Sequence, residues 1–343
     1  MKKVKWGVIG CGGIAKRRTI PGMVLAPNAE LVAVMDASPA AAEAVKEEFG
    51  AKYAFTNYED LLALDEIDAV YIASPVFAHK EQAFAAAKAK KHILLEKPLG
   101  LTLEDSIEII ELCEKEGVKL GVGLMMRYHA YHQAIKKIIA EGKIGDIVSM
   151  RAQFTCWYPK MEGAWRQDKT ISGGGALMDM GIHCIDLLQY ISGLNTVECT
   201  GYAYNQTFGY NADDSAAVIM KMDNGALAYV DSNFNIPDAA AKCPLEFYGT
   251  KGSIFAVGTL SQDDGGTVEV LVCDDSVGYD AQQNRSLVQP MELEVEFGNL
   301  YTKEIAAFSE AVLTDSEPPV NGRNTILVQR IIDAIYKNGG GKF

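Results

Sequence analysis

The sequence is short of positive charge, of histidine and of long apolar runs. Its 343 residues include 32 Lys and Arg against 45 Asp and Glu, giving a formal net charge of −13, and only five histidines. So acidic a surface repels phosphate backbones, which excludes a general nucleic-acid role but not one locally bound nucleotide. No apolar run reaches the roughly 18 residues of a membrane span, so no membrane association is expected.

Cysteine occurs seven times but never as a Cys-x-x-C pair. The thiols are widely spaced, at positions 11, 113, 156, 184, 199, 243 and 273. This spacing argues against a disulfide framework and against a structural zinc site. His129 and His132 do not complete a ligand set with these thiols, so no metal is predicted. Free thiols, and the lack of a small-residue cleavage site after the basic start, predict a cytoplasmic protein.

The first third of the chain alternates short apolar runs with amphipathic stretches. This pattern predicts βαβ units and hence a doubly wound parallel sheet with right-handed crossovers. Strands are expected at 4–9, 31–35, 69–73, 92–95 and 119–122, and helices at 14–25, 39–49, 80–90 and 103–116. Ser38 suits the N-cap of the second helix, before Pro39, and Gly117 suits the end of the fourth.

After residue 123 the pattern changes to strand-like runs separated by hairpin signals such as Asp223-Asn224-Gly225. Strands are expected at 147–155, 197–204, 216–222, 226–234, 244–248, 253–257, 267–272 and 291–295, and helices at 131–141, 176–191, 301–313 and 324–336. Gly339-Gly340-Gly341 is interpreted as a frayed tail. The length favours two domains: a Rossmann domain at 1–123 and, at 124–343, an α+β domain with a mostly antiparallel sheet.

A glycine-rich turn follows the first expected strand. Gly10-Cys11-Gly12-Gly13-Ile14-Ala15 has the G-x-G-x-x-A form which, between a strand and a helix, indicates a dinucleotide site. Gly10 permits the tight turn, and Gly12 lets a pyrophosphate approach the backbone. The helix that follows offers its free N–H groups to the phosphates. The alternative is a tight glycine turn without a ligand.

Asp36 ends the second expected strand, near the spacing at which an acidic residue binds the adenosine ribose. Its carboxylate would accept hydrogen bonds from the ribose hydroxyls and repel a 2′-phosphate. Ala37-Ser38-Pro39 brings no Arg or Lys to neutralise that phosphate, so NAD is favoured over NADP. Arg17 and Arg18 on the first helix could reverse this preference, although an exposed helix face explains them as well.

Two further segments carry candidate chemistry. Glu96-Lys97-Pro98 ends the fourth strand, at the sheet edge where ligands of doubly wound folds bind, although Lys97 could equally be a surface lysine. In the helix expected at 176–191, Asp179 and His183 share a face, and Asp186 extends it. A carboxylate beside a histidine raises its basicity and fixes its orientation. The alternative is a core histidine satisfied by a neighbouring carboxylate.

Together these segments resemble the Gfo/Idh/MocA family of glucose–fructose oxidoreductase, inositol dehydrogenases and related sugar dehydrogenases, along essentially the whole chain. The matching pieces are the glycine-rich turn, Ser74-Pro75 with His79, Glu96-Lys97-Pro98, Trp165-Arg166, and Gly173-Gly174-Gly175 with Asp179, His183 and Asp186. The resemblance implies that Lys97 contacts the reacting oxygen and that Asp179 and His183 complete the acid–base site. It also implies a large open sheet in the second domain, used to form a homodimer or homotetramer. One departure is Val76, where the family commonly has Asn.

The expected activity is therefore hydride transfer between NAD and a ring secondary alcohol of a sugar, cyclitol or glycoside. His183 or Lys97 would serve as the base, titrating as a coupled pair on one substrate oxygen. The expected cofactor-binding residues are Gly10, Cys11, Gly12, Gly13, Ile14, Asp36, Ala37, Ser74, Pro75, His79, Glu96 and Lys97. The expected substrate-binding residues are Lys97, Arg127, Tyr158, Trp165, Arg166, Asp179 and His183. Two alternatives remain: a non-catalytic sugar or dinucleotide sensor, and a glycoside-cleaving enzyme that works by transient oxidation.

Overall fold

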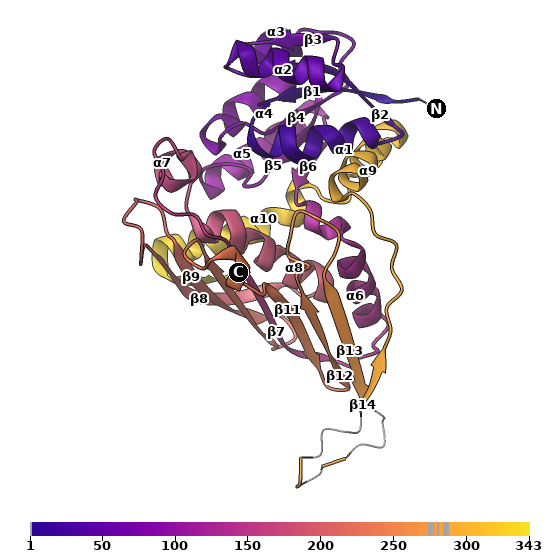
Figure 1. The fold of residues 1–343 in the computed structure, drawn as a ribbon, viewed down its shortest axis with the longest axis vertical. Helices are drawn as coiled ribbons and strands as arrows, with labels where there is room; N and C mark the ends of the chain where they lie inside the picture. The colour runs from indigo at the N-terminus through magenta and orange to yellow at the C-terminus, as the bar shows by residue number, and fades with distance from the viewer. Residues whose placement is uncertain (1, 274–277, 280, 284–287) are drawn as a thin grey trace. The chain divides into compact units, whose positions relative to one another are not determined.

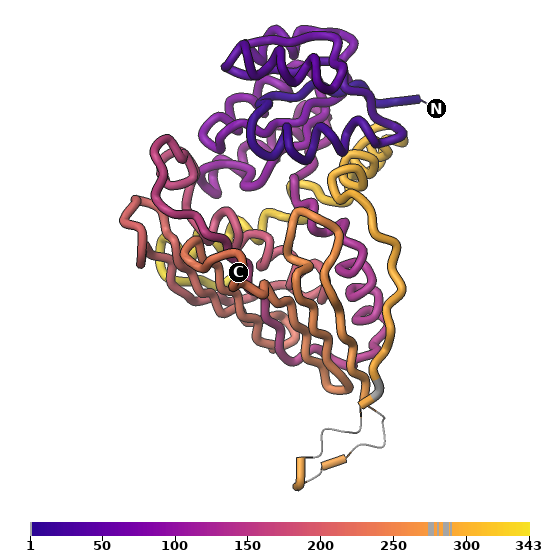
Figure 2. Tube along the Cα trace, in the orientation of Figure 1, coloured from indigo at the N-terminus to yellow at the C-terminus, as the bar shows by residue number. Residues whose placement is uncertain are grey.

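A computed structural model describes residues 2–273, 278–279, 281–283 and 288–343 of the chain (Figures 1 and 2). The chain forms two compact units, and both are discontinuous in sequence. The first unit comprises Met1–Met125, Asp168–Gly173 and Asn299–Arg330. The second comprises Met126–Gln167, Gly174–Gly298 and Ile331–Phe343. The domain division predicted after residue 123 stays a prediction, since three stretches of the chain contribute to each unit.

The first unit is built on a six-stranded parallel sheet within the described residues. The strand order is β3 (Tyr53–Phe55), β2 (Ala29–Met35), β1 (Val4–Ile9), β4 (Ala69–Ile72), β5 (His92–Glu96) and β6 (Leu120–Gly123). The order reverses direction between β1 and β4, and ligands of such sheets bind beyond the carboxyl ends of the strands at this point. The Rossmann topology predicted from the sequence is confirmed.

Most helices of this unit connect successive strands of the sheet, and two come from the later stretches 168–173 and 299–330. They are η1 (Ala15–Thr19, a π-helical turn), α1 (Ile20–Leu25), α2 (Pro39–Phe49), α3 (Tyr58–Leu62), η2 (Val76–Ala78), α4 (His79–Lys88), α5 (Leu103–Glu116), α7 (Lys169–Ser172) and α9 (Leu300–Thr314). The predicted caps are confirmed: the Ser38 side chain accepts the N–H of Ala41, and Gly117 ends α5 with φ +67°. A left-handed φ of this kind favours glycine.

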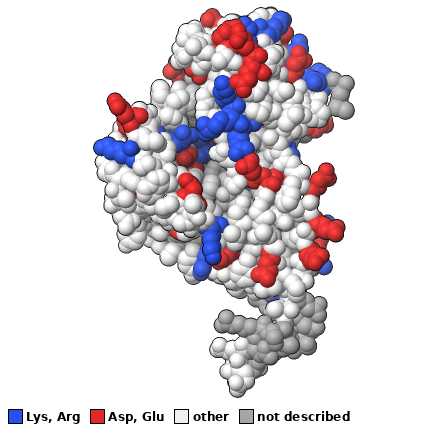
Figure 3. Space-filling view, in the orientation of Figure 1, with Lys and Arg blue, Asp and Glu red and all other residues white. Residues whose placement is uncertain are grey.

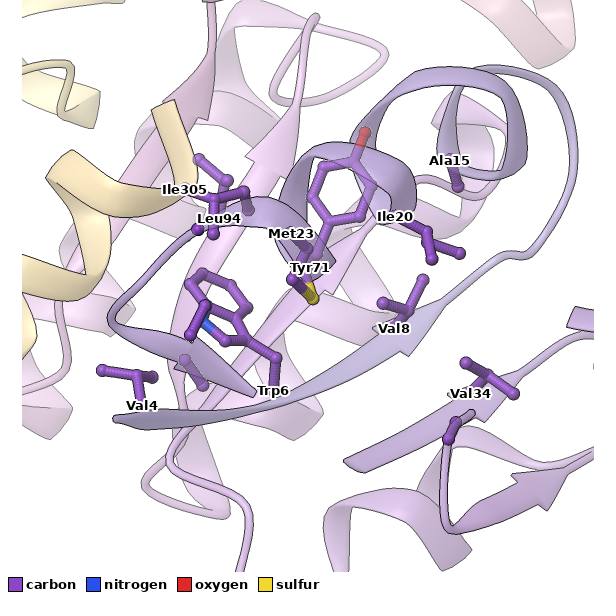
Figure 4. Close-up of a cluster of buried hydrophobic side chains, with 14 of the residues drawn as sticks. Val4, Trp6, Val8, Ala15, Ile20, Met23, Val34, Tyr71, Leu94 and Ile305 are labelled. Carbon is purple, nitrogen blue, oxygen red and sulfur yellow. The ribbon is translucent and has the colours of Figure 1, made fainter. Parts of the chain in front are cut away.

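The core of the first unit joins both ends of the chain. Trp6 on β1 is fully buried, and its ring lies 5.4 Å from that of Phe308 on α9. The indole Nε1 donates a hydrogen bond to Ser309 Oγ at 3.1 Å. Figure 4 shows Ile305 of α9 beside Leu94 and Trp6, with Tyr71 and Met23 next to them. Because α9 covers this core, residues 1–125 contain only part of their own hydrophobic interior.

The second unit contains a nine-stranded sheet within the described residues. Its order is β14 (Val288–Met291), β13 (Thr267–Cys273), β12 (Gly252–Val257), β11 (Pro244–Gly249), β7 (Ile147–Thr155), β10 (Leu227–Asn233), β9 (Ser215–Met222), β8 (Thr196–Tyr204) and β15 (Gly340–Lys342). The pairs are antiparallel except β7 with β10, which is parallel. The predicted large, mostly antiparallel sheet is confirmed.

The remaining helices of the chain belong wholly or partly to the second unit. They are η3 (Met125–Tyr128), α6 (Ala130–Ala140), η4 (Trp165–Gln167), η5 (Leu177–Gly181, a π-helical turn), α8 (Ile182–Ser192), η6 (Asp238–Ala240) and α10 (Gly322–Asn338). α8 packs on α6 and on β7, and η5 packs on β10. Within the described part of the chain, none of the helices combines the length and the apolar content that a membrane crossing requires.

Two sequence predictions are wrong. The strand expected at 291–295 ends at Met291, and the alternating residues that follow it pair with no neighbour in the described structure. Alternation indicates an extended chain, but a strand also needs a partner. The glycines expected to fray form β15, paired with β8. A Cβ on Gly340 would lie 2.2 Å from the Cys199 carbonyl oxygen, so glycine is what allows this close backbone approach.

Candidate active site

The glycine-rich turn adopts a conformation that requires glycine. Gly10 has φ +93°, and a Cβ there would lie 2.7 Å from the backbone nitrogen of Ser74, at the end of β4. A Cβ on Gly12 or Gly13 would meet no atom within 4 Å. The turn is therefore packed against the sheet at its first glycine and open at the next two. An open glycine backbone before a helical turn is the feature that a pyrophosphate needs.

Asp36 is held by two backbone N–H groups. Its Oδ2 accepts the N–H of Cys11 at 2.9 Å, and its Oδ1 accepts that of Ser38 at 2.9 Å. The carboxylate at the end of β2 thus faces the glycine-rich turn, where the sequence places the ribose of a dinucleotide. Burial raises the pKa of the Cys11 thiol to about 12, and this thiol donates to the Met35 carbonyl, so Cys11 is a neutral packing residue of the turn.

Basic residues follow the turn on η1. Lys16 and Arg17 are exposed and Arg18 is half-buried, and Lys16 pairs with Glu48 at 3.0 Å. Figure 3 shows Lys and Arg side chains gathered on one face of the first unit, on a surface where Asp and Glu are otherwise scattered. The strong net negative charge of the chain therefore coexists with a local cationic region beside the turn. Such a region attracts an anionic cofactor.

His79, expected to bind the cofactor, is 1% exposed and braces two strand ends. Its Nδ1 lies 2.9 Å from the Pro98 carbonyl oxygen and its Nε2 lies 2.9 Å from that of Ser74. Burial lowers the pKa of this imidazole, so the neutral ring is favoured. Ser74 Oγ in turn hydrogen-bonds Gln82 of α4. His79 therefore positions the segments after β4 and β5, and a direct cofactor contact stays a prediction.

Lys97 follows the last residue of β5 and is half-buried. Glu96 before it accepts a hydrogen bond from the Tyr71 hydroxyl at 2.6 Å, and Tyr71 accepts one from Thr19 Oγ1 at 3.0 Å. This relay links η1, β4 and the end of β5 inside the first unit. The end of the strand that carries Lys97 is thus fixed to the helical turn that follows the glycines. The sequence gives no hint of this relay, because Thr19 follows three basic residues and Tyr71 lies within an apolar run.

In the second unit, Asp179, His183 and Asp186 lie on η5 and α8. Each of the two carboxylates pairs with a different arginine, and the shared face predicted for Asp179, His183 and Asp186 stays a prediction. Asp186 is 1% exposed and binds Arg127, whose Nε lies 2.9 Å from Asp186 Oδ2. Asp179 Oδ2 lies 3.5 Å from Arg166 Nε.

His183 lies between them in the sequence and is 4% exposed. The Phe154 ring meets its imidazole edge-on at 6.1 Å. The structure therefore brings Asp179 together with Arg166, and Asp186 together with Arg127. Arg127 pairs with Asp186 in this structure, and its contact with a substrate stays a prediction.

Aromatic side chains surround the Asp179–Arg166 pair. The Arg166 guanidinium lies 4.3 Å from the centre of the Trp165 ring, and Tyr158 packs on Phe234 at 5.2 Å. Burial raises the pKa of Tyr158, whose hydroxyl also interacts with Arg166, so the phenol remains a neutral donor. Aromatic faces suit the C–H faces of a sugar ring, while a guanidinium and a carboxylate suit its hydroxyls. Side chains in the second unit thus offer both kinds of contact to a polyol.

Asp213 positions the start of this helical segment, and nothing in the sequence pattern indicates that role. Its carboxylate accepts the N–H groups of Gly175 and Leu177 at 2.7 and 2.8 Å and the Tyr336 hydroxyl at 2.8 Å. A Cβ on Gly175 would lie 1.8 Å from the Asp213 carbonyl oxygen, and one on Gly174 would lie 2.2 Å from the Tyr336 hydroxyl. The glycine block before Asp179 is therefore required by close packing.

The described His, Cys, Asp and Glu side chains form no cluster of three or more that could hold a metal ion. All seven cysteines are free thiols, and four of them are buried. The sequence-based expectation that no metal takes part stays a prediction.

Comparison with known proteins finds relatives along the whole chain. Residues 4–124 match the family model described as "Oxidoreductase family, NAD-binding Rossmann fold", and residues 136–339 match "Oxidoreductase family, C-terminal alpha/beta domain". A 1,5-anhydro-D-fructose reductase of Ensifer adhaerens is 29% identical over 94% of this chain and 92% of its own length. A D-xylose 1-dehydrogenase (NADP(+)) of Haloferax volcanii is 29% identical over 97% and 96%.

Solved structures share the fold at lower identity. An aldose-aldose oxidoreductase from Caulobacter crescentus, complexed with glycerol, has a TM-score of 0.87 at 22% identity and covers 100% of both chains. A levoglucosan dehydrogenase in complex with NADH and levoglucosan has a TM-score of 0.85 at 23% identity, covering 99% of both. These two likenesses show the architecture, and the residues themselves must carry any argument about substrate.

Proposed function

The chain belongs to the Gfo/Idh/MocA family of oxidoreductases, and on that premise we propose that it transfers hydride between NAD and a ring secondary alcohol of an uncharged sugar, cyclitol or glycoside. The observation that carries the proposal is the arrangement at the carboxyl ends of β1, β2 and β5. An open glycine turn, a backbone-held carboxylate at Asp36 and Lys97 all lie at this edge of one parallel sheet. That edge is where doubly wound folds bind dinucleotides.

The residues of the first unit fit NAD. Gly12 and Gly13 leave open space for a pyrophosphate, and Asp36 presents a carboxylate to the ribose hydroxyls. When bound, the nicotinamide supplies the hydride acceptor or donor of the reaction. Asp36 disfavours NADP because its negative charge repels a 2′-phosphate, while Ala37 and Ser38 bring no cation to offset it. Arg17 lies on η1, and its exposed position supports a role in the general attraction of the anionic cofactor.

Lys97, His183 and Asp179 are the proposed catalytic residues. Lys97 hydrogen-bonds the reacting oxygen and stabilises negative charge that develops on it. His183 takes the hydroxyl proton in the oxidative direction and returns it in reduction. Asp179 binds a neighbouring hydroxyl, for which its pairing with Arg166 gives it a fixed orientation.

The charge balance of the second unit supports an uncharged substrate. The two arginines expected to contact substrate are each beside a carboxylate, Arg166 beside Asp179 and Arg127 beside Asp186. A phosphate or carboxylate on the substrate would have to compete with these partners. Hydroxyl groups can instead hydrogen-bond the paired ions without separating them. The proposal therefore favours neutral polyols over sugar phosphates.

A homo-oligomer and a cytoplasmic location complete the proposal. Tyr202, Tyr204 and Ile219 on β8 and β9 are 78%, 54% and 43% exposed, which leaves an apolar surface on the sheet of the second unit. Apolar surfaces of this kind mark association sites, and a second copy of the chain would make a dimer or a tetramer. The seven free thiols support a reducing compartment.

The experiment is a screen of neutral sugars, inositols and glycosides with NAD and, separately, with NADP, following the absorbance of the reduced nicotinamide. The expected result is stoichiometric NADH with one group of uncharged polyols. Cleavage of a glycoside without accumulation of NADH would show transient oxidation instead. Binding of NAD without turnover of any member of the panel would favour a sensor and overturn the proposed activity.

A further inference from the structure

A buried carboxyl group in the first unit has no part in the mechanism above. Glu304 lies on α9 and is 1% exposed. Neither of its carboxyl oxygens has a hydrogen-bond partner among the residues that the structure describes. An ionised carboxylate in such a place would lack both water and a cation to stabilise it. A neutral carboxylic acid avoids most of that cost.

The charged group that acts on Glu304 is another carboxylate, Glu96. Glu96 ends β5 directly before Lys97 and accepts the Tyr71 hydroxyl, which itself accepts from Thr19. The direction of these hydrogen bonds makes Glu96 the acceptor at the end of the relay, as an ionised carboxylate would be. Gly123 leaves room for that carboxylate, because a Cβ there would lie 3.0 Å from the Glu96 carboxyl carbon.

Because burial and the charge of Glu96 both disfavour an ionised Glu304, we expect Glu304 to keep its proton. Burial, and second the charge of Glu96, raise the pKa of Glu304 well above the ordinary glutamate value. The Tyr71 phenol, whose pKa is also raised by burial, stays neutral between them. The other ionisable side chains on the elements packed against α9 reach solvent at least in part: Lys5, Lys16, Arg17, Arg18 and Glu30.

We propose that Glu304 is a positioning residue of the active site: it remains a neutral carboxylic acid, so that Glu96 alone carries the negative charge that receives the Tyr71 hydrogen bond and fixes the strand end bearing Lys97. Loss of the Glu304 proton would place a second negative charge beside Glu96. Repulsion would then weaken the Tyr71–Glu96 hydrogen bond and disturb the end of β5. Only the link to Lys97 rests on the proposed function, because the protonation state of Glu304 is a property of the fold.

The first experiment measures stability against pH. A glutamate that keeps its proton in the folded state but loses it in the unfolded state makes the native state less stable as pH rises above the unfolded pKa. This loss is complete only once pH passes the folded pKa. We therefore expect the folding equilibrium constant of Glu304→Gln, relative to wild type, to improve as pH rises above the unfolded glutamate pKa, by at most about tenfold for each pH unit, and to level off once pH passes the folded pKa. Urea denaturation at several pH values measures this ratio.

The matched control is Glu310→Gln on the same helix, where the carboxyl is exposed and the pH dependence should follow wild type. Glu304→Leu, also uncharged, should reproduce the slope of Glu304→Gln if the amide variant folds poorly. Infrared difference spectra of wild type minus Glu304→Gln should show the C=O stretch of a protonated carboxyl group at neutral pH. Stability profiles parallel to wild type, or the absence of that band, would overturn the neutral acid.

The second experiment tests the link to Lys97. At alkaline pH the kcat of wild type and of Glu310→Gln should fall as Glu304 ionises, while Glu304→Gln should retain its activity. KM for NAD should remain similar in all three proteins, because the glycine-rich turn and Asp36 are untouched. Parallel loss of kcat in all three would overturn the positioning role even if the stability result holds. If no substrate were turned over by any of them, the proposed function would fail, and the stability result would stand by itself.

Discussion

Two candidate site residues of the first unit are held by backbone groups, whereas two of the second unit are held by other side chains. Asp36 receives two backbone N–H groups, and His79 lies against two backbone carbonyls. Arg127 and Arg166, by contrast, are paired with carboxylates. Backbone N–H and C=O groups are present at these positions whatever side chains the neighbouring residues carry. An ion pair depends on two particular residues. Replacing one of them leaves the other charge buried without its partner, which destabilises the folded state.

The first unit is assembled from three stretches of the chain, and the most severe test of that assembly is to remove the later stretches. We expect residues 1–123 alone to fail to fold, because α9 is missing and Trp6 loses Phe308 and Ser309. Trp6 is the only tryptophan in this fragment, so its fluorescence should report an indole exposed to water. As a control, the same fragment joined by a linker to residues 299–330 should restore a buried Trp6. A folded isolated fragment would show that α9 is dispensable.

Lys97→Ala tests whether the first unit holds the chemistry as well as the cofactor. We expect kcat to fall by about 10²–10⁴-fold, since a positioned group that transfers protons or stabilises charge is lost. NAD affinity, measured by fluorescence titration, should change little, because the glycine-rich turn and Asp36 remain. Lys90→Ala, at an exposed site beyond α4, is the matched control and should keep wild-type turnover. Turnover unchanged in Lys97→Ala would remove this lysine from the mechanism.

Asp186→Asn tests the side-chain pairing of the second unit. Removing one partner leaves the Arg127 guanidinium buried without its anion, so we expect a loss of about 3–5 kcal/mol in the free energy of unfolding. Chemical denaturation measures it. Asp223→Asn, at a hairpin turn in the same unit, is the comparison and should cost far less. Equal stability of the two variants would mean that the Arg127–Asp186 pair is not held as the structure describes.

Asp36→Ala should have the smallest effect of the four. We expect NAD to bind about 10- to 100-fold more weakly, as for the loss of hydrogen bonds to a charged group, and the preference against NADP to relax. Isothermal titration with both cofactors measures the ratio. Glu43→Ala on α2 removes an equal charge at an exposed site and serves as the control. A ratio that does not change would place the reading of the ribose at other residues.

The features that could be predicted from the sequence are those whose partners are close along the chain. Gly10, Asp36 and the Ser38 cap act within a single βαβ unit, so a short motif contains them. The pairing of Arg127 with Asp186 spans 59 residues, and that of Gly175 with Asp213 spans 38. The charge of Glu96 acts on Glu304 only because residues 299–330 return to the first unit. No local pattern reports such pairings, since each depends on which elements the tertiary fold brings together.

The contrast between nearby and distant partners also explains why the sequence predicts a frayed tail at 339–341 whereas the structure shows a strand there. A glycine-rich segment stays disordered only when no unpaired strand edge lies within its reach. Here the edge of β8 is available, and the segment pairs with it. By pairing with Glu198–Thr200, β15 covers part of the backbone edge that β8 would otherwise present to other chains. Shortening the protein at Asn338 would leave that part of the edge exposed as a template for intermolecular β-pairing. We therefore expect a variant that stops at Asn338 to associate more readily than the 343-residue chain, which light scattering would measure.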